Sequence, residues 1–259
     1  MALDVKTGQK KWHYQLVHHG MWDFDIPCAP IVMDITVDGK LVKAVAQPTK
    51  QNWLYVFDRI TGKPVWPIVE KPVEKGDVPG EWYSPTQPFV TKPPAFERQC
   101  TSEADLLDFT PELHAEAVKL ASSYKMGPIF TPPVVSKWEG PRGTLIIPEV
   151  TGGANWQGGT FDPETKKFYI FTNVAIANLS LLPPEGNASD MLYVRGNARN
   201  PNPPAPGAGG APGGGAGLTV RGLPLIKPPY GTITAIDTSA SPARCAGHST
   251  AIPMPSRAT

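Results

Sequence analysis

The sequence predicts an all-β protein built from repeated hairpin units in the manner of a β-propeller. A short motif recurs along the chain, and apolar runs of strand length lie between its copies. Proline and glycine, at 31 and 25 of 259 residues, are abundant enough to require many turns and short elements. Repetition of this kind is typical of propeller blades, each of which is a small antiparallel sheet.

The repeated motif reads A-x-D-x-x-T-G-x-x-x-W at residues 2–12, and it recurs at 56–66 with valine in the first position. Residues 160–169 form a degenerate copy, and 235–238 begin a fourth. The aspartate can cap a turn, Thr-Gly supplies the positive φ that a tight turn needs, and the next strand carries an aromatic residue. The copies are unevenly spaced, which predicts four-stranded blades with large insertions.

Strands are expected between the copies, where short apolar runs are bounded by glycine, proline or polar turns. They lie at residues 43–48, 53–57, 143–148 and 167–172. One helix is expected as an insertion, with Thr110 as its N-cap, Pro111 in its first turn and an end at Gly127.

We therefore predict a partial propeller over residues 1–238, with a helical insertion at about 102–126 and a flexible proline- and glycine-rich loop at about 197–218. Residues 239–259 are predicted to be an irregular, aberrant tail, because no T-G-x-x-x-W follows Asp237. The chain also opens inside a repeat motif, so it is expected to be incomplete at both ends.

Composition excludes several classes of function. The net charge is +1 at pH 7, which gives no electrostatic case for binding nucleic acid. The three cysteines form no CxxC pair, which argues against a zinc ribbon. No apolar run reaches the length of a transmembrane helix, and residues 1–6 contain no apolar signal region.

Residues 18–27, HHGMWDFDIP, form the densest polar and aromatic cluster. Aromatic neighbours can partly desolvate Asp23 or Asp25 and suit it to act as a base, but spacing alone favours the alternative in which both cap turns while the rings pack. His18 and His19 are better explained as structural residues than as metal ligands, because no third ligand lies at a known spacing.

Two further segments could contact a ligand. Lys50, in a loop between two strands, could present a cation to an anionic cofactor or could simply be solvated. Asn155 and Trp156 follow Gly152 and Gly153, whose small size permits close backbone approach. Trp156 could stack on a flat ring or belong to the core.

Taken together, these motifs resemble the pyrroloquinoline quinone (PQQ)-dependent dehydrogenases, or quinoproteins, of the glucose/quinate branch. Residues 12–27 look like that family's W-x-x-Q-x-V-H-H-x-x-W-D-x-D-x-P, and the repeats look like its tryptophan-docking motifs. Residues 86–89, 130–133 and 228–237 match further family signatures. The likeness extends over residues 2–238.

The resemblance implies an eight-bladed propeller, with PQQ near its axis beside a divalent metal that is usually calcium. It implies oxidation of an alcohol or sugar hydroxyl, electron transfer to a quinone or cytochrome, and a location in the periplasm or at the periplasmic face of the inner membrane. The family's metal ligands lie on earlier blades, so no metal ligand is assigned in this chain.

Carried over residue by residue, the resemblance makes Asp23 the general base that takes the hydroxyl proton while hydride passes to PQQ. Lys50 would bind the quinone oxygens, with Asn155 and Trp156 beside the cofactor and His19 facing the substrate. Two alternatives remain: a non-enzymatic propeller scaffold, and an inactive truncated fragment of the dehydrogenase. The paired base and cation favour the enzyme, because a scaffold has no use for them.

Overall fold

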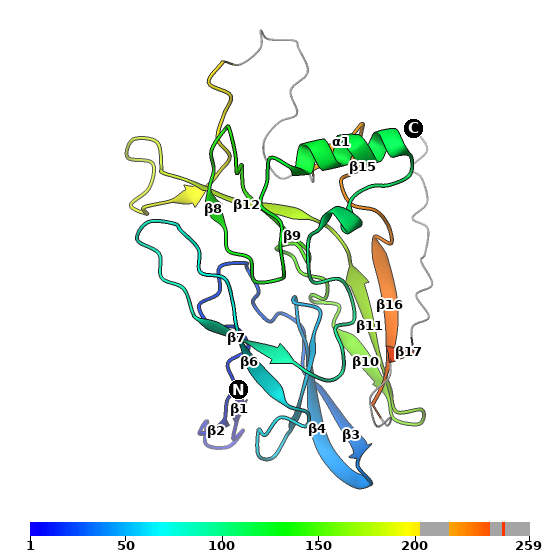
Figure 1. Ribbon diagram of the computed structural model, residues 1–259. Helices are drawn as coiled ribbons and strands as arrows, with labels where there is room; N and C mark the ends of the chain where they lie inside the picture. The colour runs from blue at the N-terminus through cyan, green and yellow to red at the C-terminus, as the bar shows by residue number, and fades with distance from the viewer. Residues whose placement is uncertain (203–217, 239–244, 247–259) are drawn as a thin grey trace.

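The computed structural model describes residues 1–202 and 218–238, together with a strand at residues 245–246. The described residues form several antiparallel sheets and one α-helix, so the all-β prediction is confirmed (Figure 1). The strands are β1 (Ala2–Leu3), β2 (Lys10–Trp12), β3 (Ile31–Val37), β4 (Lys40–Pro48), β5 (Leu54–Asp58), β6 (Ile68–Pro72), β7 (Thr86–Val90), β8 (Val134–Val135), β9 (Thr144–Ile146), β10 (Gly159–Asp162), β11 (Lys167–Asn173), β12 (Ala177–Leu182), β13 (Val194–Arg195), β14 (Thr219–Val220), β15 (Leu223–Pro224), β16 (Gly231–Asp237) and β17 (Cys245–Ala246). The helical elements are the 3-10 turn η1 (Glu103–Asp105) and the helix α1 (Pro111–Ala121).

The first large sheet has the order β3-β4-β5, and all of its pairings are antiparallel. Exposed and buried positions alternate along β3, as a half-buried strand requires. The chain after β5 continues the sheet, because Val65 N donates to Val56 O and Phe57 bridges to Pro64. The two strands expected in this region are confirmed as β4 and β5.

The turns of the repeated motif have the predicted construction. In the second copy, Asp58 Oδ1 accepts hydrogen bonds from the backbone N–H groups of Ile60 and Thr61 at 2.9 and 2.8 Å. Gly62 follows with a φ of +74°. In the degenerate third copy Asp162 keeps the capping role, and Lys166 takes the positive φ, at +55°. The aspartate is therefore the constant element of these turns, and glycine is replaceable.

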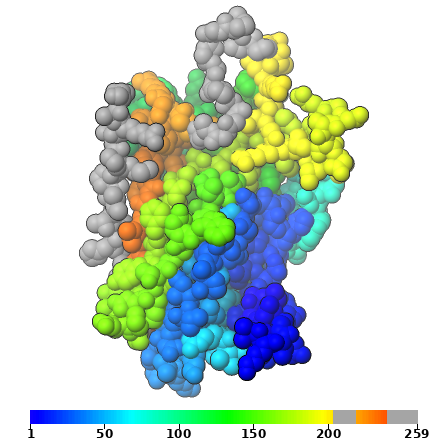
Figure 2. Space-filling view, turned by 180° about the vertical axis from the view of Figure 1, so that it is seen from behind, coloured from blue at the N-terminus to red at the C-terminus, as the bar shows by residue number. Residues whose placement is uncertain are grey.

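The second large sheet has the order β10-β11-β16-β17. It shares a core with the first sheet, in which Phe168 and Ile170 of β11 pack in one cluster with Met33 and Ile35 of β3. Figure 2 shows the yellow-green segment of β10 and β11 lying alongside the blue strands β3 and β4. This four-stranded sheet, placed beside another sheet, is the blade arrangement that the repeats predict.

The chain between β11 and β16 leaves the second sheet and builds a separate layer with α1 (Figure 1). There β12 pairs with β8, β9 and β13. The helix begins as the sequence predicts, because Thr110 Oγ1 accepts from Leu113 N at 3.3 Å and Pro111 occupies its first turn. Its buried residues Ala117 and Ala121 pack in the same cluster as Leu145 of β9. The helix therefore packs against this separate layer, and it ends at Ala121, earlier than the predicted end at Gly127.

Two predicted segments fall largely outside the described residues. Most of the predicted flexible loop lies at residues 203–217, and the predicted irregular tail lies at 239–244 and 247–259. Within the tail, β17 pairs with the end of β16 and completes the four-stranded sheet. The sequence pattern did not predict this strand, because residues 239–246 lack the rest of the motif.

Candidate functional site

Lys50 lies in a tight loop between β4 and β5, and this loop is buried. Thr49, Lys50, Gln51 and Asn52 are each no more than 6% exposed. Thr49 Oγ1 donates to Trp53 O at 2.9 Å, and Asn52 N donates to Thr49 O at 3.1 Å, with Asn52 at a φ of +69°. The loop is thus a rigid support for one lysine and not a solvated surface turn.

The Lys50 ammonium lies between two aspartates that are neighbours in the sequence cluster. Its Nζ donates to Asp23 O at 2.9 Å and forms a close ion pair with Asp25 Oδ1. Asp23 Oδ2 lies farther away, at 3.7 Å. The lysine side chain is 7% exposed, whereas the Asp23 and Asp25 side chains are 66% and 60% exposed. A shielded cation therefore lies beneath two carboxylates that face solvent.

The aromatic residues of the same cluster hold these carboxylates in place. Trp22 and Phe24 are buried in one core cluster with Phe130, and the Trp22 indole donates to Thr131 O at 2.7 Å. Asp23, between the two rings, has a φ of +61°. A positive φ in a residue other than glycine costs about 1–3 kcal/mol and persists where the surroundings enforce it. The rings pack in the core, and their packing turns the aspartates outward.

An open cleft of about 620 Å³ lies over this arrangement. Asp23 and Asp25 line it, together with the polar side chains of Gln15 and Gln47 and the ring of Tyr14. A cleft of this size accommodates a small polar molecule, and the two carboxylates can accept protons or hydrogen bonds from it.

Asn155 and Trp156 belong to a segment that packs against the back of the Lys50 loop. Gly153 N donates to Lys50 O at 3.1 Å, and a methyl group on Gly152 would overlap the lysine side chain. Trp156 is 84% exposed, which excludes a core role for it in the described structure. The two glycines therefore permit the close approach that the sequence predicts, in which Gly152 lies against Lys50 and Gly153 against the Asn52 side chain.

The same segment lines a second cavity of about 420 Å³, together with Phe171 and Asn173 of β11. The Asn155 side chain is used within its own turn, where it accepts from Trp156 N at 2.8 Å and donates to Thr151 O at 2.6 Å. Asn155 thus shapes the turn that presents the exposed indole.

His19 lies apart from the Lys50 pair. Its Nε2 is 2.9 Å from Glu81 Oε1, and its ring contacts Trp82 at a tilt of 35° with 3.9 Å between centroids. His18 pairs in the same way with Glu70 at 2.9 Å. Burial opposes ionisation of Glu70, but the hydrogen bonds from His18 and Thr86, together with the charge of His18, lower the pKa of that carboxyl. Each histidine thus has a carboxylate partner, as structural histidines do.

Three hydrogen bonds attach the Lys50 loop to the chain that precedes the helical insertion. Phe96 N donates to Asn52 O at 2.9 Å, Asn52 Nδ2 donates to Arg98 O at 2.8 Å, and Gln99 Nε2 donates to Gln51 O at 2.5 Å. The loop is therefore held on this side as well as by the glycine segment behind it.

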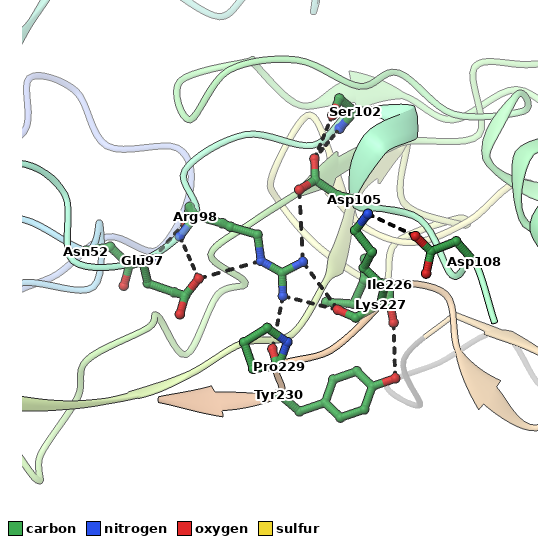
Figure 3. A network of polar contacts seen from close by, with 10 residues as sticks. All are labelled: Asn52, Glu97, Arg98, Ser102, Asp105, Asp108, Ile226, Lys227, Pro229 and Tyr230. Atoms are coloured by element: carbon green, nitrogen blue, oxygen red, sulfur yellow. Dashed lines mark hydrogen bonds and ion pairs between the residues drawn. The ribbon is translucent and has the colours of Figure 1, made fainter. Parts of the chain in front are cut away.

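The Arg98 side chain anchors that preceding segment in turn. Figure 3 shows its guanidinium between the carboxylates of Glu97 and Asp105, which lie 3.6 and 3.9 Å from the nearest guanidinium nitrogens. The same group donates to Lys227 O at 3.2 Å and to Pro229 O at 3.0 Å, just before β16 (Figure 3). Arg98 thus connects the support of the Lys50 loop to the second large sheet.

Two contacts at the site were not predicted from the sequence. Asp25 is the close ion-pair partner of Lys50, and the second aspartate of W-D-F-D is the only sequence signal for it. Cys28 Sγ donates to Asn155 O at 2.9 Å, and burial raises the pKa of its thiol to about 11. No sequence spacing could have paired residues so far apart.

Comparison with known proteins identifies the family. The model of the PQQ-dependent glucose/ethanol/alcohol dehydrogenase β-propeller domain matches residues 1–244. The chain belongs to this family. This match confirms the family resemblance and the β-propeller fold class that the sequence predicts.

Three relatives show how far this likeness extends. The chain is 34% identical over 246 residues to the quinate/shikimate dehydrogenase (quinone) of Acinetobacter baylyi. It is 35% identical over 263 residues to the glycerol dehydrogenase large subunit of Gluconobacter oxydans, and 32% identical over 251 residues to the quinoprotein glucose dehydrogenase of Escherichia coli. Each match covers 92% of this chain. The chain spans 29–33% of the length of these relatives.

Among the residues that the structure describes, no group of three His, Cys, Asp or Glu side chains is placed to hold a metal ion. Within the same residues, no helix has the length and apolar character that crossing a bilayer requires.

Proposed function

We propose that the chain is part of a PQQ-dependent dehydrogenase that oxidises a hydroxyl group of an alcohol or a sugar, with Asp23 as the general base. The observation that carries this proposal is the pairing of Asp23 with Lys50. A carboxylate that is 66% exposed borders an open cleft, and a shielded ammonium lies 3.7 Å behind it. This is the pairing of base and cation that a dehydrogenase needs and that a scaffold does not.

The residues present fit the cofactor. PQQ is a flat, anionic quinone, which calls for a cation, hydrogen-bond donors and an aromatic surface. Lys50 has three N–H donors, of which Asp23 O and Asp25 Oδ1 take two, so one remains for a ligand oxygen. The exposed indole of Trp156 offers a flat surface on the neighbouring segment. Lys50 and Trp156 would therefore hold the cofactor, with Asn155 fixing the turn that carries the indole.

The bound quinone would supply the acceptor for the hydride that leaves the substrate carbon. The proton of the substrate hydroxyl would pass to the Asp23 carboxylate, whose position between two buried rings fixes its direction. The Lys50 ammonium would stabilise negative charge that develops on a ligand oxygen beside it. A substrate-facing role for His19 rests on the family resemblance alone, because its ring contacts Glu81 and Trp82 and is not among the residues that line the cleft.

The wider setting of the enzyme is part of the proposal. We infer calcium beside the cofactor with its ligands elsewhere in the enzyme, a quinone or cytochrome as electron acceptor, and a periplasmic location. The names of the relatives, which are dehydrogenases of quinate, glycerol and glucose, support only the quinone chemistry, since two of them are described as quinone enzymes or quinoproteins. The calcium ion and the periplasmic location rest on the family resemblance alone.

Dye-linked turnover of the purified full-length protein tests the proposal. PQQ and calcium are added, and reduction of an artificial dye is followed with ethanol, glycerol, glucose or quinate as substrate. We expect PQQ-dependent reduction with at least one of them, and a loss of about 10²- to 10⁴-fold in kcat for D23N. The D23N protein should still quench its tryptophan fluorescence on binding PQQ.

The matched control is D34N, because Asp34 forms its ion pair with Arg59 on the first sheet, outside the cleft residues. Turnover of D23N at the wild-type rate would refute the role of Asp23. If the wild type bound no PQQ and reduced no dye, the scaffold or inactive fragment would replace the enzyme as the explanation.

A further inference from the structure

We propose that Asp25 is a positioning residue, which holds the Lys50 ammonium at a fixed place and thereby keeps the Asp23 carboxylate free to accept the substrate proton. This inference rests on the proposed function, because it concerns how the base and the cation of that site are kept apart. It assigns a distinct part to each aspartate of the W-D-F-D sequence.

The Lys50 ammonium needs an anion close to it. Its side chain is 7% exposed, and a shielded ammonium without an anion is strongly unfavourable. Asp25 Oδ1 is the close partner, and Asp23 contributes its backbone carbonyl at 2.9 Å. The charge of the lysine is therefore balanced mainly by Asp25.

The Asp23 carboxylate lies farther from the Lys50 ammonium than the Asp25 carboxylate does. Its nearer carboxylate oxygen is 3.7 Å from Lys50 Nζ, beyond the range of a hydrogen bond. A carboxylate whose lone pairs are occupied by an ammonium is a poor proton acceptor. The 3.7 Å separation therefore leaves the Asp23 carboxylate available to a substrate in the cleft.

Removal of the Asp25 charge would leave Lys50 without its close ion-pair partner. Asp23 would be the nearest remaining carboxylate, and a small side-chain rotation would bring it within hydrogen-bond range of Lys50. Its backbone would not need to move, because the Asp23 carbonyl already binds the same nitrogen. The base would then be drawn into the ion pair that Asp25 had satisfied.

The experiment compares D25N, D25E and the control D34N in the full-length protein. Asparagine keeps the shape and one acceptor oxygen of Asp25 but removes its charge, and glutamate restores the charge. Crystal structures of the wild type and D25N without PQQ give the Lys50 Nζ to Asp23 Oδ2 distance. We expect this distance to contract to about 3 Å in D25N, which is the ordinary hydrogen-bonding range.

Turnover provides the second readout. For D25N we expect kcat to fall by about 10- to 100-fold, which is less than removal of the base itself costs. The KM and the dissociation constant for PQQ, measured by fluorescence quenching of the apoprotein, should change by less than about threefold. D25E should recover most of kcat, and D34N should behave as the wild type.

Three outcomes would overturn the inference. They are an unchanged kcat in D25N, a D25N structure in which Asp23 stays 3.7 Å from Lys50, or equal losses of kcat in D25N and D34N. Because the distance is measured without cofactor, it decides the role of Asp25 even if wild-type turnover is absent and the proposed function fails.

Discussion

The indole ring of Trp12 lies directly against the α-carbon of Gly62. The two residues belong to successive copies of the repeated motif, and the indole N–H donates to Arg59 O in the turn that contains Gly62, at 3.1 Å. A methyl group on Gly62 would lie 2.5 Å from the ring. This contact joins one repeat to the next, as the tryptophan-docking resemblance implies.

Replacing Gly62 should therefore cost more than replacing its counterpart Gly8. Both have a similar φ, +74° and +71°, but no atom lies within 4 Å of a methyl group placed on Gly8. We expect G8A to lower the free energy of unfolding by about 1–2 kcal/mol, the cost of a left-handed alanine. G62A should lose about 1–3 kcal/mol more through overpacking against Trp12. Urea unfolding measures both, and equal losses would contradict the docking role.

The hydrogen bond of Trp12 can be tested apart from its bulk. W12F keeps an aromatic ring but leaves Arg59 O without its indole donor, so we expect a loss of about 1 kcal/mol in the free energy of unfolding. W82F is the control, because Trp82 is 60% exposed. A W12F protein as stable as W82F would show that the ring and not the N–H holds the repeats together.

The turn aspartates should make stability depend on pH in the acid range. The backbone hydrogen bond from Thr61 lowers the pKa of Asp58 from its ordinary value of 3.8. The folded protein thus holds this proton less tightly than the unfolded chain, and the stabilisation is present above pH 3.8 and lost as the pH falls through the lowered pKa.

We therefore expect D58N to be less stable than the wild type at pH 6, with the difference shrinking as the pH approaches 3. Urea unfolding at a series of pH values measures it. A difference that stays constant with pH would show that the Asp58 contribution is not electrostatic.

The thiols should differ sharply in reactivity. Cys28 is 3% exposed, and burial raises the pKa of its thiol to about 11, whereas Cys100 is exposed. Because the thiolate is the reactive form, we expect a thiol reagent at pH 8 to modify Cys100 much faster than Cys28. Mass spectrometry of the peptides measures this, and labelling in urea is the control. Equal rates in the native protein would mean that the region around Cys28 opens readily.

Much of the fold could be predicted because its signals are local. The turns follow from Asp58 and its glycine, the start of the helix from Thr110 and Pro111, and the strands β4, β5, β9 and β11 from short apolar runs. The strand β17 could not be predicted, because its two residues have no pattern of their own and pair only through the edge of β16.

The sequence predicts which residues belong to the candidate site, but it does not predict the contacts that they make. The sequence placed Asp23 and Lys50 in one site through a family motif, and the structure brings the two together. The pairing of Asp25 with Lys50 and the anchoring of the Lys50 loop through Asn52 depend on side-chain directions and on distant segments. The spacing of residues in the sequence gives neither the side-chain directions nor the contacts between distant segments.

The support of the Lys50 loop has a consequence for the order in which the protein matures. The loop is fixed by Arg98 and Gln99 on one side and by Gly153 on the other, and Arg98 is itself anchored at Pro229. Contacts between such distant positions form late in folding, because the chain must first close long loops. We therefore expect Lys50 to reach its final place only after the segment around Pro229 has docked against Arg98. A ligand that bound beside Lys50 would therefore select chains in which these distant contacts have already formed, and would stabilise that folded state.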